Sequence, residues 1–261
     1  MSLLLDRKDG VARVTLNRPE LRNAFDDALI DSLRNAFLEL AGDSAVRVVV
    51  LAGNGPAFCA GADLNWMKRM AGYSEEQNLA DARALAGMLS ALERMPKPTI
   101  ARVHGPAFAG GTGLVSVCDI AVGTPEAKFC FSEAKLGLTP ATISPYVIRA
   151  IGERAARRYF LSAEVFDAEE ARRIGLLSAL VPAGELDATV DSLIKHLLAG
   201  AGAAHARIKE LIRDVASRPV DAALIAETAR RIAEARASAE GKEGIASFLE
   251  KRKASWCLPK S

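Results

Sequence analysis

Apolar and polar positions in the first part of the chain predict strands that alternate with helices. Residues 11–16 alternate like a half-buried strand and end at Asn17-Arg18-Pro19, where asparagine and proline favour a turn. Residues 26–40 repeat apolar positions at helical spacing, and residues 46–51 form a continuous apolar run typical of a buried strand. This order of elements indicates an α/β protein.

The same order recurs further along the chain. The pattern predicts a helix over 74–94, a strand over 99–103 and, after a glycine-rich turn and a short helix, a strand over 119–122. Beyond residue 144 the pattern is helical except at 176–181, and no Gly/Ser linker marks an independent module. We therefore predict a β/α core over residues 1–190 and a helical C-terminal region over residues 191–261.

Composition and charge exclude several classes of protein. The 261 residues are 50% hydrophobic, and 34 basic residues nearly balance 32 acidic ones, so the formal charge of +2 gives no general case for nucleic acid or an anionic membrane. No apolar run approaches the length of a membrane span, and the four cysteines show no CxxC spacing. Neither His196 nor His205 has other potential metal ligands near it in the sequence. We expect a cytoplasmic protein with no metal and no membrane or nucleic-acid partner.

Three segments are candidates for chemistry. Phe58–Leu64 and Gly105–Leu114 both follow a predicted strand, and their small residues let a ligand approach backbone N–H groups at a helix start. If those N–H groups converge, they form an oxyanion hole; the alternative is a pair of tight strand-to-helix turns. Glu133 lies among apolar residues that would raise its pKa and suit it to acid/base work, unless it caps a helix or pairs with Lys135.

Together these segments resemble the crotonase (enoyl-CoA hydratase/isomerase) superfamily over nearly the whole chain. The similarity is carried by four stretches: Asn17-Arg18-Pro19-Glu20 with Asn23-Ala24, Ala60-Gly61-Ala62-Asp63-Leu64, Val103–Ile120, and Ala168–Leu177. The resemblance implies an α/β fold, a crotonase-like spiral of stacked ββα units with a helical C-terminal trimerisation region. It also implies a homo-oligomer, as a trimer or a dimer of trimers.

The resemblance assigns roles to individual residues. The N–H groups of Ala62 and Gly110 would hold the thioester oxygen of an acyl-CoA substrate, and Glu133 falls on the second catalytic glutamate of the family. Ala60, Asp63 and Leu64 would receive the adenine end of coenzyme A. Coenzyme A enters only as part of the substrate, so no separate cofactor is expected.

One position departs from the family pattern. Hydratases with paired catalytic glutamates carry the first of them where this chain has Gly113. Glu133 would then make both proton transfers of a hydration alone, or act as the single base of a Δ3,Δ2-enoyl-CoA isomerase. A third alternative, from another class, is a catalytically weak relative that binds RNA.

Finer segments resemble bacterial 3-methylglutaconyl-CoA hydratases. These are Asp63–Met70, Ile143–Ile148 and Glu243–Trp256, and they favour water addition to a branched 2-enoyl-CoA with a distal carboxylate. Such a carboxylate needs a cation, for which Lys68, Arg69 and Arg149 are candidates; solvated helix-face charges are the alternative for each. Tyr146 either lines the acyl pocket with its hydroxyl or packs in the core.

Overall fold

The computed structural model describes residues 1–257 and divides the chain into two compact units. The first unit spans Met1–Leu193, and the second begins at Ile194. Helix α7 (Leu186–Ala199) contains the boundary between them. Within residues 1–257 all the strands lie in the first unit, whereas the described part of the second unit is helical.

A six-stranded sheet in the first unit has the order β1-β2-β3-β4-β6-β9. Its strands are β1 (Leu3–Lys8), β2 (Val11–Leu16), β3 (Val48–Gly53), β4 (Thr99–Val103), β6 (Ile120–Gly123) and β9 (Ala179–Leu180). β1 pairs with β2 antiparallel, and every other neighbouring pair is parallel. Because β2 is buried at every second residue and nearly all of β3 is buried, the observed pattern follows the apolar pattern of the sequence.

A second, three-stranded sheet has the order β5-β7-β8. It consists of β5 (Ala107–Phe108), β7 (Lys128–Cys130) and β8 (Phe166–Asp167). β5 and β7 are parallel, with Phe108 opposite Cys130, and β7 and β8 are antiparallel. This small sheet brings the segment that follows β4 next to the segment that follows β6.

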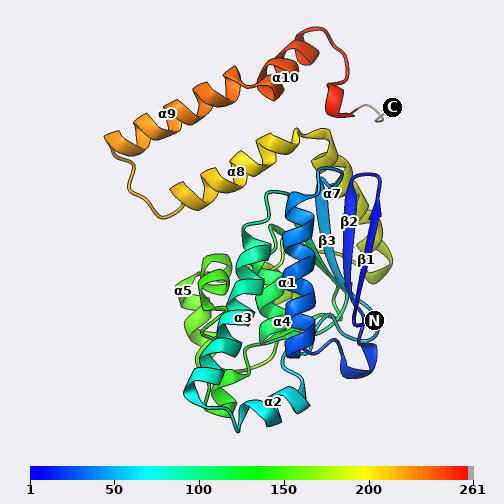
Figure 1. Cartoon of the computed structure of the whole chain (residues 1–261), viewed down its shortest axis with the longest axis vertical. Coiled ribbons are helices and arrows are strands. Elements are labelled where there is room, and N and C mark those ends of the chain that lie inside the picture. The colour runs from blue at the N-terminus through cyan, green and yellow to red at the C-terminus, as the bar shows by residue number, and fades with distance from the viewer. Residues whose placement is uncertain (258–261) are drawn as a thin grey trace. The chain divides into compact units, whose positions relative to one another are not determined.

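The first unit also contains helices. They are α1 (Asp27–Gly42), α2 (Leu64–Met70), α3 (Glu75–Glu93), α4 (Gly110–Val117), α5 (Ser144–Ser162) and α6 (Ala168–Arg173), with short 3-10 turns at η1 (Pro19–Leu21), η2 (Glu133–Leu136) and η3 (Ala183–Glu185). Of these helices, α1, α4 and α6 contact strands of the larger sheet. α1 begins at Asp27 because the Asp26 side chain accepts the N–H of Leu29 at 2.8 Å. α1 and α3 pack side by side, and the predicted α/β class is confirmed (Figure 1).

The second unit consists of α8 (Gly202–Val215), α9 (Ala222–Ala237), α10 (Ala239–Leu249) and the turn η4 (Ser255–Cys257). Asp221 caps α9, and Ser238 caps α10 through the N–H of Gly241. Many large apolar side chains of this unit are exposed: Ile208, Ile212, Val220, Ile225, Ile232, Ile245, Phe248 and Leu249. Its expected role in oligomerisation remains a prediction.

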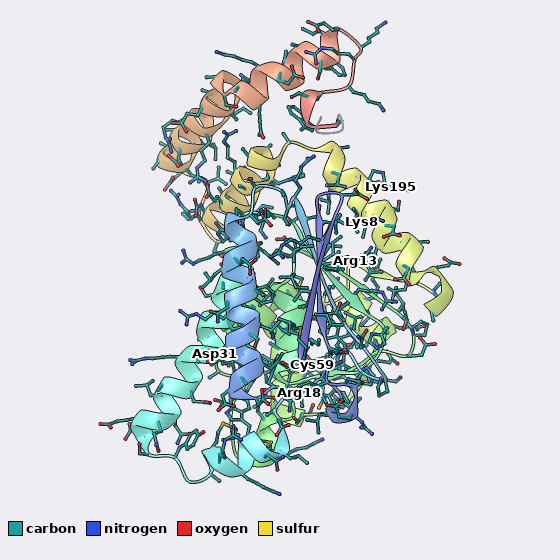
Figure 2. All side chains as sticks on the ribbon, turned by 45° about the vertical axis from the view of Figure 1, so that its right-hand side comes forward. Lys8, Arg13, Arg18, Asp31, Cys59 and Lys195 are labelled. Atoms are coloured by element: carbon teal, nitrogen blue, oxygen red, sulfur yellow. The ribbon has the colours of Figure 1, made fainter. Side chains whose placement is uncertain are left out.

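The parallel strands place the candidate segments at one end of the larger sheet. The carboxyl ends of parallel strands lie at the same edge, and ligands of α/β proteins bind there. Arg18 follows β2 and Cys59 follows β3, and both are labelled near the start of α1 (Figure 2). The turn that contains Ala62 and the glycine-rich segment after β4 therefore meet at this end.

Candidate active site

The first candidate donor is the N–H of Ala62, and Phe25 holds the backbone on either side of it. The N–H of Phe25 donates to the carbonyl of Gly61 at 2.7 Å, and the carbonyl of Phe25 accepts the N–H of Asp63 at 2.7 Å. In a trans peptide the C=O and N–H point in opposite directions, so the N–H of Ala62 points away from Phe25. Among the backbone hydrogen bonds between described residues, none uses this N–H as the donor.

The turn around Ala62 lies directly against the glycine-rich segment. Gly61 has a φ of +90°, and a Cβ on it would lie 3.0 Å from the carbonyl oxygen of Phe108, so only glycine fits there without strain. The N–H of Phe108 donates to the carbonyl of Cys59 at 2.9 Å. A Cβ on Gly111 would lie 2.4 Å from the same Cys59 oxygen. Both candidate donors therefore lie on adjoining segments.

The second candidate donor, the N–H of Gly110, opens helix α4. Ala109 precedes it with φ 47° and ψ −116°, a rare conformation for a residue other than glycine, and no side chain caps the helix. This conformation is held by the hydrogen bond from the N–H of Ala109 to the carbonyl of Cys130, at 2.8 Å. The first intrahelical bond is made by the N–H of Gly113, so the N–H of Gly110 remains available to a ligand.

The pairing of β7 with β5 connects the segment before Glu133 with the segment of the second donor. Glu133 follows Cys130 by three residues, and the carbonyl of Cys130 binds the N–H next to Gly110. Within residues 1–257, the Oε2 atom of Glu133 is buried without a hydrogen-bond partner, and no ion pair joins Glu133 to Lys135. Burial raises the pKa of Glu133 above its usual range. A carboxyl with one buried and unpartnered oxygen is suited to proton transfer.

Ile143 occupies the space where a second glutamate would begin. A Cβ on Gly113 would lie 2.4 Å from Cγ2 of Ile143 and 3.0 Å from its Cβ. Ile143 is fully packed, and Gly113 is buried within α4. A larger residue at position 113 therefore requires Ile143 to move, and the packing favours a single carboxyl in this part of the site.

The Asp63 carboxylate has hydrogen-bond and ion-pair partners within the protein. The carboxylate accepts the N–H of Asn65 at 2.8 Å and of Trp66 at 3.2 Å, which caps α2, and it pairs with Arg18 at 3.1 Å. Although burial opposes ionisation, the N–H groups of Trp66 and Asn65 and the guanidinium of Arg18 hold the pKa of Asp63 below its usual value. Arg18 also pairs with Asp26 at 2.8 Å. A contact of Asp63 with coenzyme A remains a prediction.

The other residues expected to bind coenzyme A differ in exposure. Ala60 is half-buried and donates its N–H to the carbonyl of Arg22 at 2.9 Å, whereas the Leu64 side chain is 74% exposed. Lys68 is exposed on α2, on the face opposite the buried Trp66. Within residues 1–257 no ion pair is found for Lys68.

The two arginines proposed for a distal carboxylate already have partners. Arg69 pairs with Asp27 at 2.8 Å, and Arg149 pairs with Glu93 at 3.3 Å. Tyr146 is half-buried against the core, where burial and then the charge of Glu93 raise its pKa. The structure thus brings Tyr146 and Arg149 together with Glu93 at the end of α3.

Sequence reasoning missed Asn23 and Ile143 as parts of the site. Asn23 is buried with φ +57°; its side chain donates to the carbonyl of Ala57 at 2.9 Å and accepts the N–H of Arg18 at 2.8 Å. These hydrogen bonds therefore hold the turn after β3 in place. In the sequence, Asn23 stands out only as part of a stretch that resembles the family, without a role of its own. No spacing rule connects Ile143 with Gly113.

The described part of the chain gives little support to a metal site, a membrane span or a thiol nucleophile. Residues 1–257 contain no group of three or more His, Cys, Asp or Glu side chains arranged to hold a metal ion. In the same residues, no helix combines the length and apolar character that crossing a bilayer demands. Burial raises the pKa of Cys59 to about 12, so its thiol stays protonated at neutral pH and is no nucleophile.

The fold and the comparisons with known proteins agree on a family. The parallel sheet, the small second sheet and the glycine-rich strand-to-helix turns are features of an enzyme of the crotonase fold, and a family model for enoyl-CoA hydratase/isomerase matches residues 6–258. The chain belongs to the enoyl-CoA hydratase/isomerase family. This confirms the resemblance and the predicted fold class.

Individual relatives match over nearly their whole length. The crystal structure of a Legionella pneumophila protein described as an enoyl-CoA hydratase/isomerase (crotonase) is 45% identical, with a TM-score of 0.93 and 98% of each chain covered. A Thermus thermophilus protein described as an enoyl-CoA hydratase is 36% identical over 94% of this chain and 96% of its own length. The 2,3-dehydroadipyl-CoA hydratase of Escherichia coli is 34% identical over 96% of both.

Proposed function

We propose that this chain is a hydro-lyase that adds water reversibly to a 2-enoyl-CoA thioester, with Glu133 as its single acid/base. The observation that carries the proposal is the Oε2 atom of Glu133, buried without a hydrogen-bond partner within residues 1–257, three residues after the Cys130 carbonyl that accepts the N–H next to Gly110. The N–H groups of Gly110 and Ala62 would bind the thioester oxygen. Membership of the family supports an acyl-CoA substrate.

The proposed reaction needs one proton acceptor that later becomes the donor. The Glu133 carboxylate takes a proton from water while the oxygen of that water bonds to C3 of the enoyl group. The C2–C3 π electrons move toward the thioester, and the negative charge that develops on its oxygen is held by the two N–H groups. Protonated Glu133 then gives the proton to C2, so the added H and the added OH both come from one water. The pKa raised by burial makes the carboxylate a better base, and no step calls for a cofactor.

The acyl group we favour is 3-methylglutaconyl or a related branched glutaconyl group. The resemblance of three segments supports it, and the name of the Escherichia coli relative indicates that a carboxylated acyl-CoA is accepted within the family. Lys68 is the one candidate cation for which residues 1–257 provide no ion pair. The substrate's own carboxylate would then position the water that a second glutamate holds in other hydratases.

A second candidate is a Δ3,Δ2-enoyl-CoA isomerase. The packing of Ile143 against Gly113 favours it, because moving one proton between two carbons needs only one carboxyl. The oxyanion hole would have the same role in both reactions.

A panel of three thioesters distinguishes these candidates. The purified enzyme is incubated with 3-methylglutaconyl-CoA, crotonyl-CoA and a 3-enoyl-CoA, and hydration and isomerisation are followed separately. We expect fast hydration of 3-methylglutaconyl-CoA and poor turnover of crotonyl-CoA, which lacks the carboxylate. Efficient crotonyl-CoA hydration would contradict the proposed substrate, and isomerisation without any hydration would establish the second candidate.

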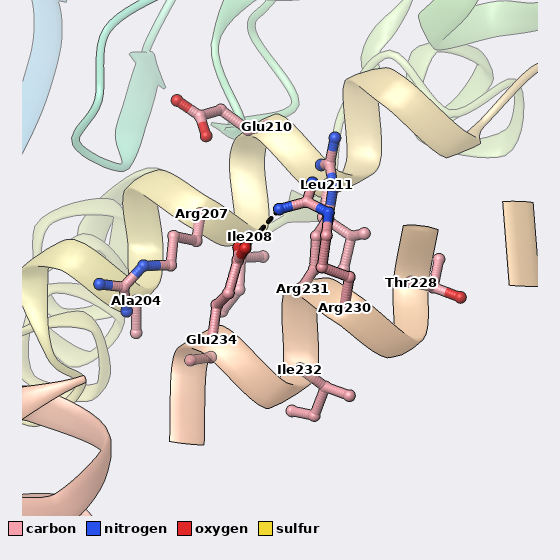
Figure 3. Close-up of a pocket in the computed structure, with 11 residues that line it drawn as sticks. Ala204, Arg207, Ile208, Glu210, Leu211, Thr228, Arg230, Arg231, Ile232 and Glu234 are labelled. Carbon is pink, nitrogen blue, oxygen red and sulfur yellow. Dashed lines mark hydrogen bonds and ion pairs between the residues drawn. The ribbon is translucent and has the colours of Figure 1, made fainter. Parts of the chain in front are cut away.

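We also propose that the protein forms a trimer or a dimer of trimers in the cytoplasm, and that the second unit makes the contacts. Phe248 and Leu249, at the end of α10, are 82% and 72% exposed, and Ile245 on the same helix is 52% exposed; clustered exposed apolar surface marks interaction sites. α8 and α9 also line a hollow of about 570 Å³, into which Ile208 and Leu211 contribute apolar surface beside the ion pair of Arg230 with Glu234 (Figure 3).

Light scattering tests the oligomer. We expect a mass of three or six chains, and a smaller mass for Phe248→Glu. The control Leu38→Glu adds the same charge at an exposed leucine of α1 and should leave the mass unchanged. A monomeric wild-type protein would contradict this proposal.

A further inference from the structure

Phe25 contacts the segments of both candidate oxyanion donors, although the proposed reaction assigns it no role. It lies between the Asn23-Ala24 pair and the start of α1, and it is 1% exposed. Its N–H and carbonyl form the two 2.7 Å hydrogen bonds with Gly61 and Asp63 on either side of Ala62. The backbone of Phe25 therefore fixes the orientation of the Ala62 peptide.

The ring of Phe25 lies against the second donor. A Cβ on Gly110 would lie 2.7 Å from Cε2 and 3.0 Å from Cδ2 of this ring. The ring thus packs on the α-carbon of the residue whose N–H opens α4. Phe25 therefore connects both donor residues, one through its backbone and the other through its ring.

The surroundings hold Phe25 firmly. Asn23, two residues earlier, is buried and donates to the carbonyls of Asn54 and Ala57, both at 2.9 Å. Asp26, the next residue, caps α1 and pairs with Arg18 at 2.8 Å. Phe25 is therefore anchored to the end of β3 on one side and to the start of α1 on the other.

The spacing of the donors is what such an anchor controls. Donors in an oxyanion hole act only when they lie about 2.7–3.1 Å from the developing charge, and an error of about 1 Å lowers the rate about a hundredfold. Ala109, which precedes Gly110, has a strained backbone, so the first turn of α4 needs support from its neighbours. We infer that Phe25 is a positioning residue that sets the separation of the Ala62 and Gly110 N–H groups; this rests on the proposed function, which makes these groups the oxyanion donors.

Phe25→Leu tests the inference by kinetics. It keeps the backbone hydrogen bonds and removes the ring face against Gly110, so kcat should fall roughly 10- to 100-fold while KM changes by less than about threefold. Phe37→Leu is the matched control: Phe37 is also fully buried, on α1, and should retain the wild-type kcat despite the same loss of packing. Phe25→Met keeps more of the apolar volume and replaces Phe25→Leu if thermal unfolding shows that the latter does not fold.

The infrared stretching frequency of a bound thioester carbonyl reports directly on the oxyanion hole. The saturated analogue of the best acyl-CoA of the panel, with carbon-13 at the thioester carbonyl, cannot be hydrated, and its infrared band moves to lower frequency when N–H groups polarise the carbonyl. We expect a lowered band in the wild type and in Phe37→Leu, and a band closer to that of the free thioester in Phe25→Leu or Phe25→Met.

The two claims fail in different ways. A wild-type band at the free value would overturn the oxyanion hole itself and with it the proposed function. A lowered wild-type band that the Phe25 variants share, together with an unchanged kcat, would overturn only the inference and leave Phe25 as a core residue.

Discussion

Gly113→Ala is predicted to destabilise the protein because of Ile143. The added methyl group would lie 2.4 Å from Cγ2 of Ile143, whereas carbon atoms in contact are about 3.5–4.0 Å apart, so one of them must move by about 1 Å. Overpacking of this kind costs about 1–3 kcal/mol, and the helix propensity of alanine over glycine returns about 1 kcal/mol. We therefore expect a net loss of up to about 2 kcal/mol in the free energy of unfolding.

Two substitutions of Ile143 isolate the atom responsible. Ile143→Ala removes Cγ2 and keeps Cβ, which lies 3.0 Å from the added methyl, so in that background most of the cost of Gly113→Ala should vanish and the change should lie within about 1 kcal/mol of neutral. Ile143→Val removes only Cδ1, which lies 3.9 Å from the added methyl, and should leave the destabilisation intact. The double-mutant cycle with Ile143→Ala should thus give a coupling of about 1–3 kcal/mol, and the cycle with Ile143→Val much less.

Urea unfolding at a fixed protein concentration measures these values, because the stability of an oligomer depends on concentration. If Gly113→Ala stabilised the otherwise wild-type protein by the helix-propensity value alone, or if the two cycles agreed within about 0.5 kcal/mol, Ile143 would not fill the position of the second glutamate.

The remaining predictions concern charge. Because burial raises the pKa of Glu133, and the base must be ionised, kcat/KM should fall with decreasing pH at a pKa above the usual glutamate value of about 4.3; a pH–rate profile with its acid limb at or below that value would contradict this. The Arg173 guanidinium and the Tyr159 hydroxyl lower the pKa of Glu170 to about 2, so Glu170→Gln should destabilise the protein at neutral pH, and the difference should vanish as the pH falls from about 4 to about 2. A difference that persists at pH 2 in urea unfolding would speak against this linkage. Asp63→Ala should cost about 1–3 kcal/mol of unfolding free energy and Asp63→Asn less, since asparagine still caps α2; equal losses would show that the cap contributes little.

The long strands and helices could be predicted because each has a period. The predicted strand over 99–103 coincides with β4, and the helix over 26–40 nearly coincides with α1. β1 was missed because most of it is exposed at the sheet edge, where Asp6-Arg7-Lys8 interrupts the alternation. β5 and β8 have two residues each, too few to show any period.

The site was predictable only in its parts. The glycine-rich turns and Glu133 stand out in the sequence, whereas their arrangement depends on contacts between distant segments. The backbone of Ala109 is held by Cys130, and the space beside Gly113 is filled by Ile143. The partners of Arg149 and Arg69 also come from other helices, so the sequence alone could not show that these charges are already paired.

Turnover by Glu133→Gln tests the central claim most directly. The substitution keeps the shape of the side chain and removes its ability to take a proton, so kcat on the best acyl-CoA of the panel should fall by about 10²–10⁴. Glu126→Gln, a matched change at an exposed glutamate nearby in the sequence, should leave kcat unaltered. A Glu133→Gln enzyme that keeps kcat within about threefold of the wild type would show that another group moves the proton.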